Sequence, residues 1–427
     1  MKFDYGKDGI EINLDPYWNV TILHPENQEV IENPVEAIKE AIKNPIGCLP
    51  LCDIVKKKIS SQTVCIVVSD ATRPVPSHFI LEALVKELNE YGIDEASITI
   101  LIATGLHRAS NSDEIEHIVG KKIAQRQLNI INHEAKEKSL QKYLGESSNG
   151  SPIYIDKHFY EADLKILTGY VEPHFFFGFS GGRKSLIPGT AGEETIINSH
   201  SADLISSPHA RFGIYKDNPM HKHSLEIAKK AEVDYIVNIC INEEHKVTQV
   251  AAGDLEKAHE DLVNYQLQHA FKEIKEPYDI VVCGNGGYPL DLNLYQAVKS
   301  MAIGEMGVKR GGTIISVNEC RGGVGVGQDK FKELIFSDKK PEEIYNKILM
   351  KEIVVPDQWQ IQVLTRILMK SEIYLVSSMK EEEIGNIGLK YADTVENAIK
   401  NSLIKHGSNA DILILPNGPQ ILPLINK

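Results

Sequence analysis

The sequence predicts an α/β protein of two domains, each a layered sheet with flanking helices. Three observations support this prediction. The 427 residues exceed the usual size of one domain, and short apolar runs alternate with helix-like segments in both halves. A charged stretch at 272–277 ends in proline, so we expect an N-terminal domain over 1–273, a C-terminal domain over 278–427 and an active site in the cleft between them.

Three apolar runs in the first half predict strands that are buried on both faces. They cover residues 63–68, 97–102 and 164–167. Each run ends in a polar loop, and a helix signal follows. Ligands of such sheets collect at the carboxyl ends of the strands. The loops after these strands should therefore bring four polar side chains into one crevice: Asp70, Arg73, His107 and His174.

The first sixty residues are expected to be an irregular lead-in, with extended pieces near 9–14 and 19–23 and one helix over 34–44. Ser77 should cap the helix after the first strand, and Gly92 should follow the end of that helix. A shorter helix should end at Gly120. His221 and His223 are expected at the exposed start of a later helix.

The alternation of strands and helices continues to the end of the N-terminal domain and repeats in the second half. Strands are predicted at 235–241, 279–283, 313–317, 373–376 and 411–415, and helices at 254–272 and from about residue 292.

The stretch from 168 to 200 joins the third strand to a helix through a glycine-rich turn. Thr190 and Glu193 have the spacing of a capping box. A helix that starts there would place Ile196, His200 and Leu204 on one face, with His200 pointing inward.

Lys184 follows the glycines of this turn, whose backbone can approach a ligand closely. A phosphate-binding P-loop is one alternative, but its pattern needs glycine directly before the lysine, where Arg183 stands. A surface lysine in a basic pair with Arg183 is the plainer alternative. His200 alone would be a packed core histidine, because one imidazole cannot complete an all-protein metal site.

Composition limits the possible partners. A net charge of −13 without a long basic run argues against nucleic acid and anionic membranes. The N-terminus lacks a signal-peptide core, and no stretch approaches the roughly 20 apolar residues of a membrane span, so we expect a cytoplasmic protein. The six cysteines form no CxxC pair and should be reduced thiols.

Five motifs make the chain recognisable as an ordered set. They are SDATRPVP at 69–76, ATGLHR at 103–108, HFFFGFSGGRKS at 174–185, NGGYPLDLNLYQAVK at 285–299 and PDQW at 356–359. Together they resemble the lactate racemase family that uses a nickel-pincer nucleotide. This cofactor is a pyridinium-3,5-bisthiocarboxylate mononucleotide attached covalently to a lysine. One motif alone would be weak, whereas five in order are specific.

The resemblance assigns roles to individual residues. Lys184 is the lysine that carries the cofactor, and His200 is the nickel ligand, which completes a square-planar field with two sulfurs and a carbon of the pincer. His107 and His174 match the catalytic pair, since a racemase needs one base for each enantiomer. The cofactor is expected to contact Asp70, Thr72, Gly181 and Gly182, and the substrate to contact Arg73, Tyr295, Gln296, Lys299 and Trp359.

These residues also have plainer interpretations. Arg73 could simply pair with Asp70, although its planar fork suits a carboxylate or phosphate. His107 and His174 could be loop histidines. Tyr295 and Lys299 lie one helical turn apart and could belong to a solvated face.

The implied activity is the interconversion of D- and L-lactate by hydride transfer to and from the cofactor, through bound pyruvate. The implied partners are a 2-hydroxy acid substrate and the proteins that make the cofactor and insert nickel. Three alternatives stay open. They are a racemase or epimerase of another 2-hydroxy acid with the same cofactor, a non-catalytic nickel or nucleotide carrier that needs no histidine pair, and a phosphoryl-transfer enzyme.

Overall fold

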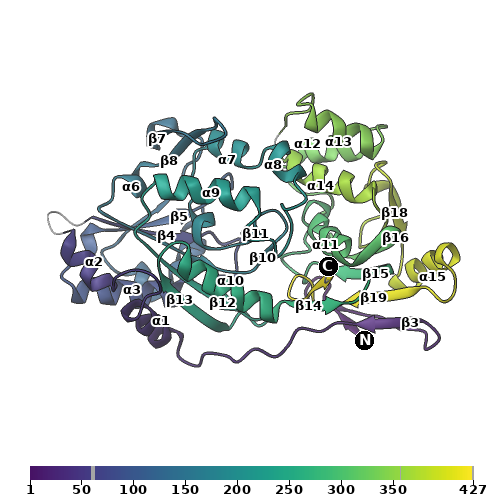
Figure 1. Cartoon of the computed structure of the whole chain (residues 1–427), viewed down its shortest axis with the longest axis horizontal. Helices are drawn as coiled ribbons and strands as arrows, with labels where there is room; N and C mark the ends of the chain where they lie inside the picture. The colour runs from purple at the N-terminus through teal and green to yellow at the C-terminus, as the bar shows by residue number, and fades with distance from the viewer. Residues whose placement is uncertain (59–62, 356, 426–427) are drawn as a thin grey trace. The chain divides into compact units, whose positions relative to one another are not determined.

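The computed structural model describes residues 1–58, 63–355 and 357–425, which form two compact units (Figure 1). One unit contains residues 28–267, and the other combines residues 268–427 with residues 1–27. The change of unit thus falls shortly before the expected boundary at 272–277. The first 27 residues pack with the C-terminal half, whereas we expected them in the N-terminal domain.

Strand β3 (Asn19–Ile22) explains this difference. It pairs in parallel with β19 (Asp411–Leu415), so that Asn19 lies opposite Asp411. Such pairing satisfies the backbone N–H and C=O groups of the N-terminal segment. The local sequence does not reveal that partner, because it lies nearly 400 residues away.

Residues 28–267 contain a six-stranded sheet with the order β13-β12-β9-β4-β5-β6. Neighbouring strands are parallel, except that β12 and β13 are antiparallel. The strands are β4 (Val64–Ser69), β5 (Ile98–Ala103), β6 (Asn129–Asn132), β9 (Leu164–Tyr170), β12 (Tyr235–Ile241) and β13 (Val247–Gly253). The four strands predicted in this region are confirmed to within a few residues. Because β9, β4 and β5 are adjacent and parallel, the loops that carry His174, Asp70 and His107 leave the same edge of the sheet.

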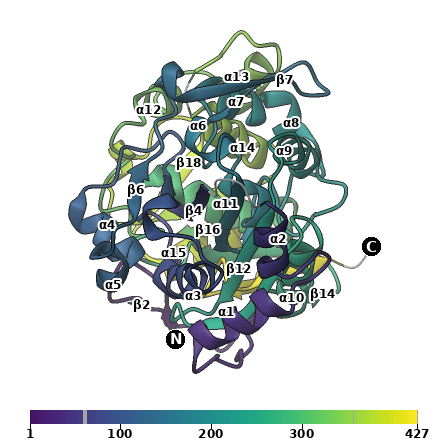
Figure 2. The ribbon, with the colours of Figure 1, turned by 90° about the vertical axis from the view of Figure 1, so that its left-hand side faces the viewer.

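Helices cover both faces of this sheet. α1 and α3 pack side by side on one face, and α6 and α9 lie on the other (Figures 1 and 2). Ile38, Ile66 and Leu84 are fully buried in the core between α1, α3 and the sheet. The helices are α1 (Pro34–Lys43), α2 (Leu51–Lys57), α3 (Ser77–Glu90), α4 (Ser112–Val119), α5 (Lys121–Ala124), α6 (Lys157–Tyr160), α7 (Glu193–Ser199), α8 (Ala202–Ser206), α9 (Pro219–Lys230) and α10 (Lys257–His269).

Two predicted helix starts are wrong. Ser77 is the first residue of α3, and Pro76 precedes it without a capping hydrogen bond. Thr190 does not cap α7, which begins at Glu193. The N–H of Glu193, which a Thr190 cap would have to accept, donates instead to the carbonyl of Ala135 at 2.9 Å. By contrast, Gly92 follows α3 as predicted, with φ of +89°.

The structure corrects two expectations about histidines in this unit. α7 ends before His200, and Leu204 lies in α8, so the predicted common face of Ile196, His200 and Leu204 does not form. His200 nevertheless points inward and is 9% exposed. His221 and His223 in α9 are also buried, which corrects the expectation of an exposed helix start.

Two short antiparallel pairs shape the loops of this unit. β7 (Gln141–Glu146) pairs with β8 (Pro152–Asp156), and β10 (Pro173–His174) pairs with β11 (Gly178–Phe179). The second pair places His174 directly opposite Gly178. Strands of two residues leave no periodic pattern, so the sequence did not predict them.

The other unit contains a six-stranded, all-parallel sheet with the order β18-β17-β16-β15-β19-β3. Its further strands are β15 (Tyr278–Gly284), β16 (Val308–Val317), β17 (Glu372–Val376) and β18 (Leu389–Ala392). Short pairs join β1 (Lys2–Phe3) to β2 (Ile10–Glu11) and β14 (Phe271–Ile274) to β20 (Leu422–Ile425). The helices are α11 (Leu294–Gly307), α12 (Asp329–Ile335), α13 (Pro341–Leu349), α14 (Gln358–Leu368) and α15 (Val395–His406).

The strands predicted in this half are confirmed, as is the helix expected from about residue 292. Ile280, Ile315 and Ile412 are fully buried on neighbouring strands and form part of the core. Within the described ranges, no helix has both the length and the apolar character needed to cross a membrane.

Candidate active site

Asp70 and His107 form a hydrogen-bonded pair just beyond the ends of β4 and β5. Asp70 is 5% exposed, its Oδ2 lies 2.7 Å from Nδ1 of His107, and its Oδ1 accepts from the Thr72 hydroxyl at 2.6 Å. Burial raises the pKa of Asp70, but the hydrogen bonds from His107 and Thr72 and the nearby charge of Arg73 outweigh burial and lower it overall. The ionised carboxylate holds the Nδ1–H tautomer of His107, so Nε2 carries the lone pair.

His174 has the opposite tautomer. Its Nδ1 accepts from the backbone N–H groups of Phe176 at 3.1 Å and Phe177 at 3.3 Å. A nitrogen that accepts two hydrogen bonds carries no proton, so the ring proton of neutral His174 lies on Nε2. The two histidines therefore present different atoms: a lone pair on His107 Nε2 and an N–H on His174 Nε2.

The ring of Phe177 lies among three of the predicted site residues. Its centroid is 5.5 Å from the His174 ring, 5.4 Å from the His200 ring and 4.7 Å from Nζ of Lys184. Phe177 is fully buried, and a cation over an aromatic face is attracted to it. The structure thus brings His174, Lys184 and His200 together around a residue that the sequence analysis did not select. The aromatic run at 175–177 was the available signal.

Lys184 lies in a single 3₁₀ turn over Gly182–Ser185. Gly181 and Gly182 before it have φ of +71° and +52°, which favour glycine. A Cβ at Gly181 would lie 2.8 Å from Oδ1 of Asn238, and one at Gly182 would lie 2.9 Å from the His259 ring. Protein atoms thus occupy the space that these glycines leave, and the glycines shape the turn that presents Lys184.

Arg183 points away from the surface, which rules out the exposed basic pair with Lys184. It is 1% exposed, and its guanidinium donates to the carbonyls of Gly181 at 3.2 Å and Phe177 at 3.0 Å. Burial lowers the pKa of Arg183 to about 10. The guanidinium of Arg183 therefore stabilises the loop that contains Phe177 and Gly181 from its buried side.

His200 has the features of a single metal ligand. Its Nδ1 lies 3.0 Å from the carbonyl oxygen of Ile196. A carbonyl can only accept, so Nδ1 carries the proton and Nε2 the lone pair, as in most metal-bound histidines. Burial, chiefly, lowers the pKa of His200 to about 4, and nearby Lys184 acts in the same direction. The imidazole is therefore neutral at pH 7, the form that binds metal.

An all-protein metal site is absent from residues 1–58, 63–355 and 357–425, where no three His, Cys, Asp or Glu side chains converge suitably. Any metal held by His200 would need its other ligands from a bound molecule.

The predicted residues of α11 and α14 lie in the other compact unit and form a network of their own. The Tyr295 hydroxyl donates to Oδ1 of Asp357 and accepts from Nε1 of Trp359, both at 2.9 Å. Burial first, and then the Asp357 charge, raise the pKa of Tyr295 well above its usual value. Asp357 has φ of +63°, a strained conformation for a non-glycine residue. Asp357 was missed as a site residue, although it stands in the PDQW motif, whose Pro356 lies outside the described residues.

Gln296 and Lys299 are half-buried on α11, and Arg73 is exposed in the loop after β4. Lys299 follows Tyr295 by one helical turn, so these two residues share a face as predicted. The N–H of Gln296 donates to the side chain of Asn293, which caps α11.

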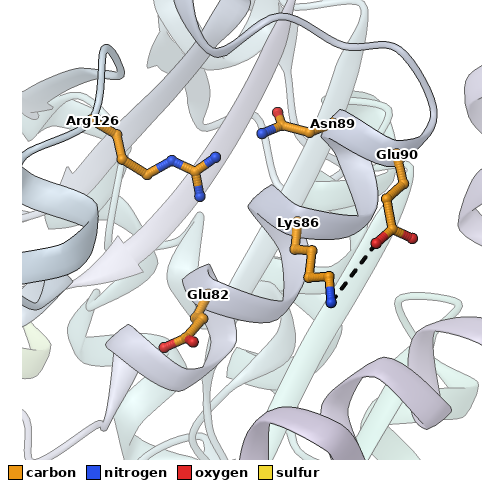
Figure 3. Close-up of a pocket in the computed structure, with 5 residues that line it drawn as sticks. All are labelled: Glu82, Lys86, Asn89, Glu90 and Arg126. Carbon is orange, nitrogen blue, oxygen red and sulfur yellow. Dashed lines mark ion pairs between the residues drawn. The ribbon is translucent and has the colours of Figure 1, made fainter.

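A hollow on the outer surface of α3 lies apart from these groups (Figure 3). It is lined by Glu82, Lys86, Asn89, Glu90 and Arg126. Nζ of Lys86 is 3.9 Å from Glu90, while Glu82 and Arg126 pair with Lys122 and Glu95. Oppositely charged neighbours thus neutralise one another there, and none of the predicted site residues lines the hollow.

The two histidine rings offer a small molecule a proton acceptor, Nε2 of His107, and a hydrogen-bond donor, Nε2–H of His174. Such groups at the loop edge of a parallel sheet are typical of α/β enzymes. Residues 5–213 match the family model for the lactate racemase N-terminal domain, and residues 274–422 match that for the lactate racemase C-terminal domain. The chain belongs to the lactate racemase family and is an isomerase of the racemase type.

Individual relatives agree with this assignment. The lactate racemase of Thermoanaerobacterium thermosaccharolyticum is 34% identical over 427 residues, which cover 99% of this chain and 98% of the relative. That of Lactiplantibacillus plantarum is 36% identical over 389 residues, 90% of this chain and 89% of the relative. The lactate racemase apoprotein from T. thermosaccharolyticum superposes with a TM-score of 0.90 at 32% identity, covering 99% of both chains. A Thermotoga maritima protein at 22% identity, with a TM-score of 0.68, shares the fold over 94% of this chain and 100% of its own.

Proposed function

We propose that this chain interconverts D- and L-lactate. The observation that carries the proposal is the pairing of Asp70 with His107, together with a second loop histidine of opposite tautomer, His174, at the same edge of the sheet. The relatives named lactate racemases support the choice of substrate.

The proposed cofactor is the nickel-pincer nucleotide, attached at Lys184, with nickel held by His200. The support lies in the donor set: His200 offers one neutral imidazole with its lone pair on Nε2, and Lys184 and His200 flank the Phe177 ring. One ligand from the protein suits a metal whose other ligands belong to the cofactor. Held by Lys184 and His200, this cofactor would supply hydride-transfer chemistry at C2 of lactate, with bound pyruvate as the proposed intermediate.

The two histidines handle the proton of the substrate hydroxyl. Nε2 of His107 is ready to accept that proton, and the positive charge that results is stabilised by Asp70 at 2.7 Å. The Nε2–H of neutral His174 is a hydrogen-bond donor and not an acid. To act as the base for the other enantiomer, His174 must carry its ring proton on Nδ1, and the hydrogen bonds from Phe176 and Phe177 to Nδ1 must then be released.

The roles of Asp70, Thr72, Gly181 and Gly182 change in this proposal. We expected all four to contact the cofactor. Asp70 orients His107, Thr72 holds the Asp70 carboxylate through a 2.6 Å hydrogen bond, and the glycines shape the turn of Lys184.

Substrate binding is proposed for the remaining predicted residues. Arg73 and Lys299 are proposed to bind the lactate carboxylate, because their cations compensate its charge. Tyr295, Gln296 and Trp359 are proposed to shape the pocket, with Tyr295 fixing the indole of Trp359.

The proposal has a direct test. Chain matured with the cofactor-making and nickel-inserting proteins, which are its proposed partners, would be incubated with pure L-lactate and pure D-lactate, and the enantiomers separated over time. Both should reach a one-to-one mixture. Intact mass and mapping of the Lys184 peptide should show the attached nucleotide.

The open alternatives give different results. Activity on other chiral 2-hydroxy acids but not on lactate would indicate a racemase or epimerase of another 2-hydroxy acid. Full cofactor loading without turnover of any 2-hydroxy acid would indicate a carrier, and racemisation by protein with unmodified Lys184 would exclude the attached cofactor.

A further inference from the structure

His133 is a fully enclosed histidine outside the predicted site, and its two ring nitrogens face different acceptors. Nδ1 lies 2.7 Å from Oδ2 of Asp156, and Nε2 lies 2.9 Å from the carbonyl oxygen of Ala191. His133 is 3% exposed and Asp156 1% exposed, so water does not replace either contact.

The two acceptors differ from the ring in that they lack a proton to donate. A peptide carbonyl only accepts. The other oxygen of Asp156, Oδ1, accepts from the backbone N–H of His158 at 2.9 Å and lies 3.0 Å from Nδ1 of His158; these contacts favour the ionised carboxylate, whose Oδ2 only accepts. A neutral imidazole has a single N–H, so one of its nitrogens would face an acceptor with a lone pair. Both hydrogen bonds form only when both ring nitrogens carry protons.

The same histidine is joined to the loop of His107. The N–H of His133 donates to Ile102 at 3.0 Å, and the carbonyl of His133 accepts from the Thr104 hydroxyl at 2.7 Å. Thr104 in turn accepts from the N–H of His107 at 2.8 Å. The backbone of His133 thus fixes the start of the turn that ends at His107.

The ring of His133 is joined to the segment between Lys184 and α7. It holds the Ala191 carbonyl, and the N–H of Asp156 holds the Thr190 carbonyl at 3.0 Å. Gly189, just before them, donates to the Lys184 carbonyl at 3.3 Å and accepts from the N–H of Gly105 at 3.0 Å. One residue therefore contacts two loops, and both loops carry proposed site residues.

We propose that His133 is a positioning residue, an imidazolium that locks the His107 turn to the Lys184–α7 segment. The charge state does not depend on the proposed function, whereas the positioning role rests on the functions proposed for His107 and Lys184. His133 itself touches no proposed substrate or cofactor group.

The first test reads the ring directly. The cofactor-free full chain, labelled with ¹⁵N in its histidine rings, would be studied by long-range ¹H–¹⁵N correlation at pH 8, where a free histidine, with a pKa of about 6.5, is neutral. We expect two slowly exchanging N–H protons on the His133 ring, assigned by their loss in His133→Gln. An unprotonated ring nitrogen at pH 8 would overturn the proposal.

The second test reads the loops. In His133→Asn the amide nitrogen replaces Nδ1, so the contact to Asp156 is kept and the contact to Ala191 is lost. Hydrogen exchange over 104–107 and 186–192 should accelerate about tenfold, the effect of losing one buried hydrogen bond. His158→Asn is the matched control, because His158 contacts the same carboxylate but neither loop. Unchanged exchange in His133→Asn, or equal acceleration in both variants, would contradict the lock.

In matured protein, His133→Asn should lower kcat at least about tenfold through misplacement of site residues, with a smaller change in KM. A larger change in KM than in kcat would argue against positioning.

If the wild-type chain racemised no 2-hydroxy acid, the proposed function would be wrong. The protonation of the His133 ring and the hydrogen exchange of the two loops would still show whether His133 locks the loops together. If neither His133 variant folded, the wild-type spectrum would decide, since it must contain one protected ring with two N–H protons.

Discussion

Oδ2 of Asp70 lies 2.7 Å from Nδ1 of His107, and the carboxylate is buried whereas half of the His107 side chain is exposed. The buried partner fixes the tautomer, and the exposed ring presents Nε2.

Asp70→Asn should lower kcat by roughly 10²- to 10⁴-fold, because an amide can stabilise the wrong tautomer and cannot balance the charge of a protonated His107. The mass added to Lys184 should not change. Thr72→Val is the control, since it removes only the hydroxyl that supports Asp70 and should have a much smaller effect. Loss of the added mass in Asp70→Asn would return Asp70 to the cofactor-binding role that the sequence suggested.

Removing either base should nearly abolish racemisation. His107→Ala and His174→Ala each delete one proton carrier, and a missing general acid or base costs about 10²- to 10⁴-fold. Both variants should still carry the nucleotide on Lys184, which peptide mapping checks. A variant that kept most of its activity would refute the two-base scheme.

His200→Gln should lose nickel while Lys184 stays modified, because the amide lacks the imidazole lone pair. Metal analysis measures the nickel content, and intact mass measures the modification of Lys184. His223→Gln is the control, since His223 is also a buried histidine but is not proposed as a ligand. Equal nickel content in His200→Gln and the wild-type protein would place the metal elsewhere.

Phe177→Leu tests the ring that lies among His174, Lys184 and His200. Leucine keeps most of the apolar volume, so the loss of stability should be about 1 kcal/mol, while the contact between the Lys184 cation and the ring is removed. We expect slower attachment of the nucleotide and lower kcat. Phe179→Leu changes an equally buried ring that faces Tyr215. Phe179→Leu should lose as much stability as Phe177→Leu but keep its rate of nucleotide attachment and its kcat. Equal losses of function in both variants would show that Phe177 has no special role.

Three buried histidines make stability depend on pH. Burial lowers the pKa of His200 to about 4, of His259 to about 3 and of His221 to about 2. In the unfolded chain these rings titrate near pH 6.5, so between about pH 6.5 and pH 4.5 the unfolded state binds protons that the folded state excludes. The free energy of unfolding should therefore decrease as pH falls through this window.

Urea denaturation between pH 4.5 and pH 8 would measure this effect. His221→Gln should flatten the dependence on pH, because it removes one of the rings that protonate only on unfolding. A wild-type stability that stayed constant from pH 8 to pH 4.5 would contradict the argument.

Local patterns located the elements that carry the candidate site. Apolar runs located the strands, parallel order placed the loops of Asp70, His107 and His174 at one edge, and the family resemblance carried by the ordered motifs selected Lys184 and His200. The capping box at Thr190 failed, because the N–H of Glu193 donates to the carbonyl of Ala135, and nothing near Thr190 in the sequence indicates that contact.

The sequence alone determined the fold class, the family resemblance and the residue types that carry the chemistry, since periodicity and motif order are local properties of the chain. Only the tertiary structure decided which partner each residue has. The partner of Asp70 is 37 residues away, and those of His133 are 23 and 58 residues away. Hydrogen bonds between such distant residues fix tautomers, charge states and loop positions, and they form only when the chain has folded.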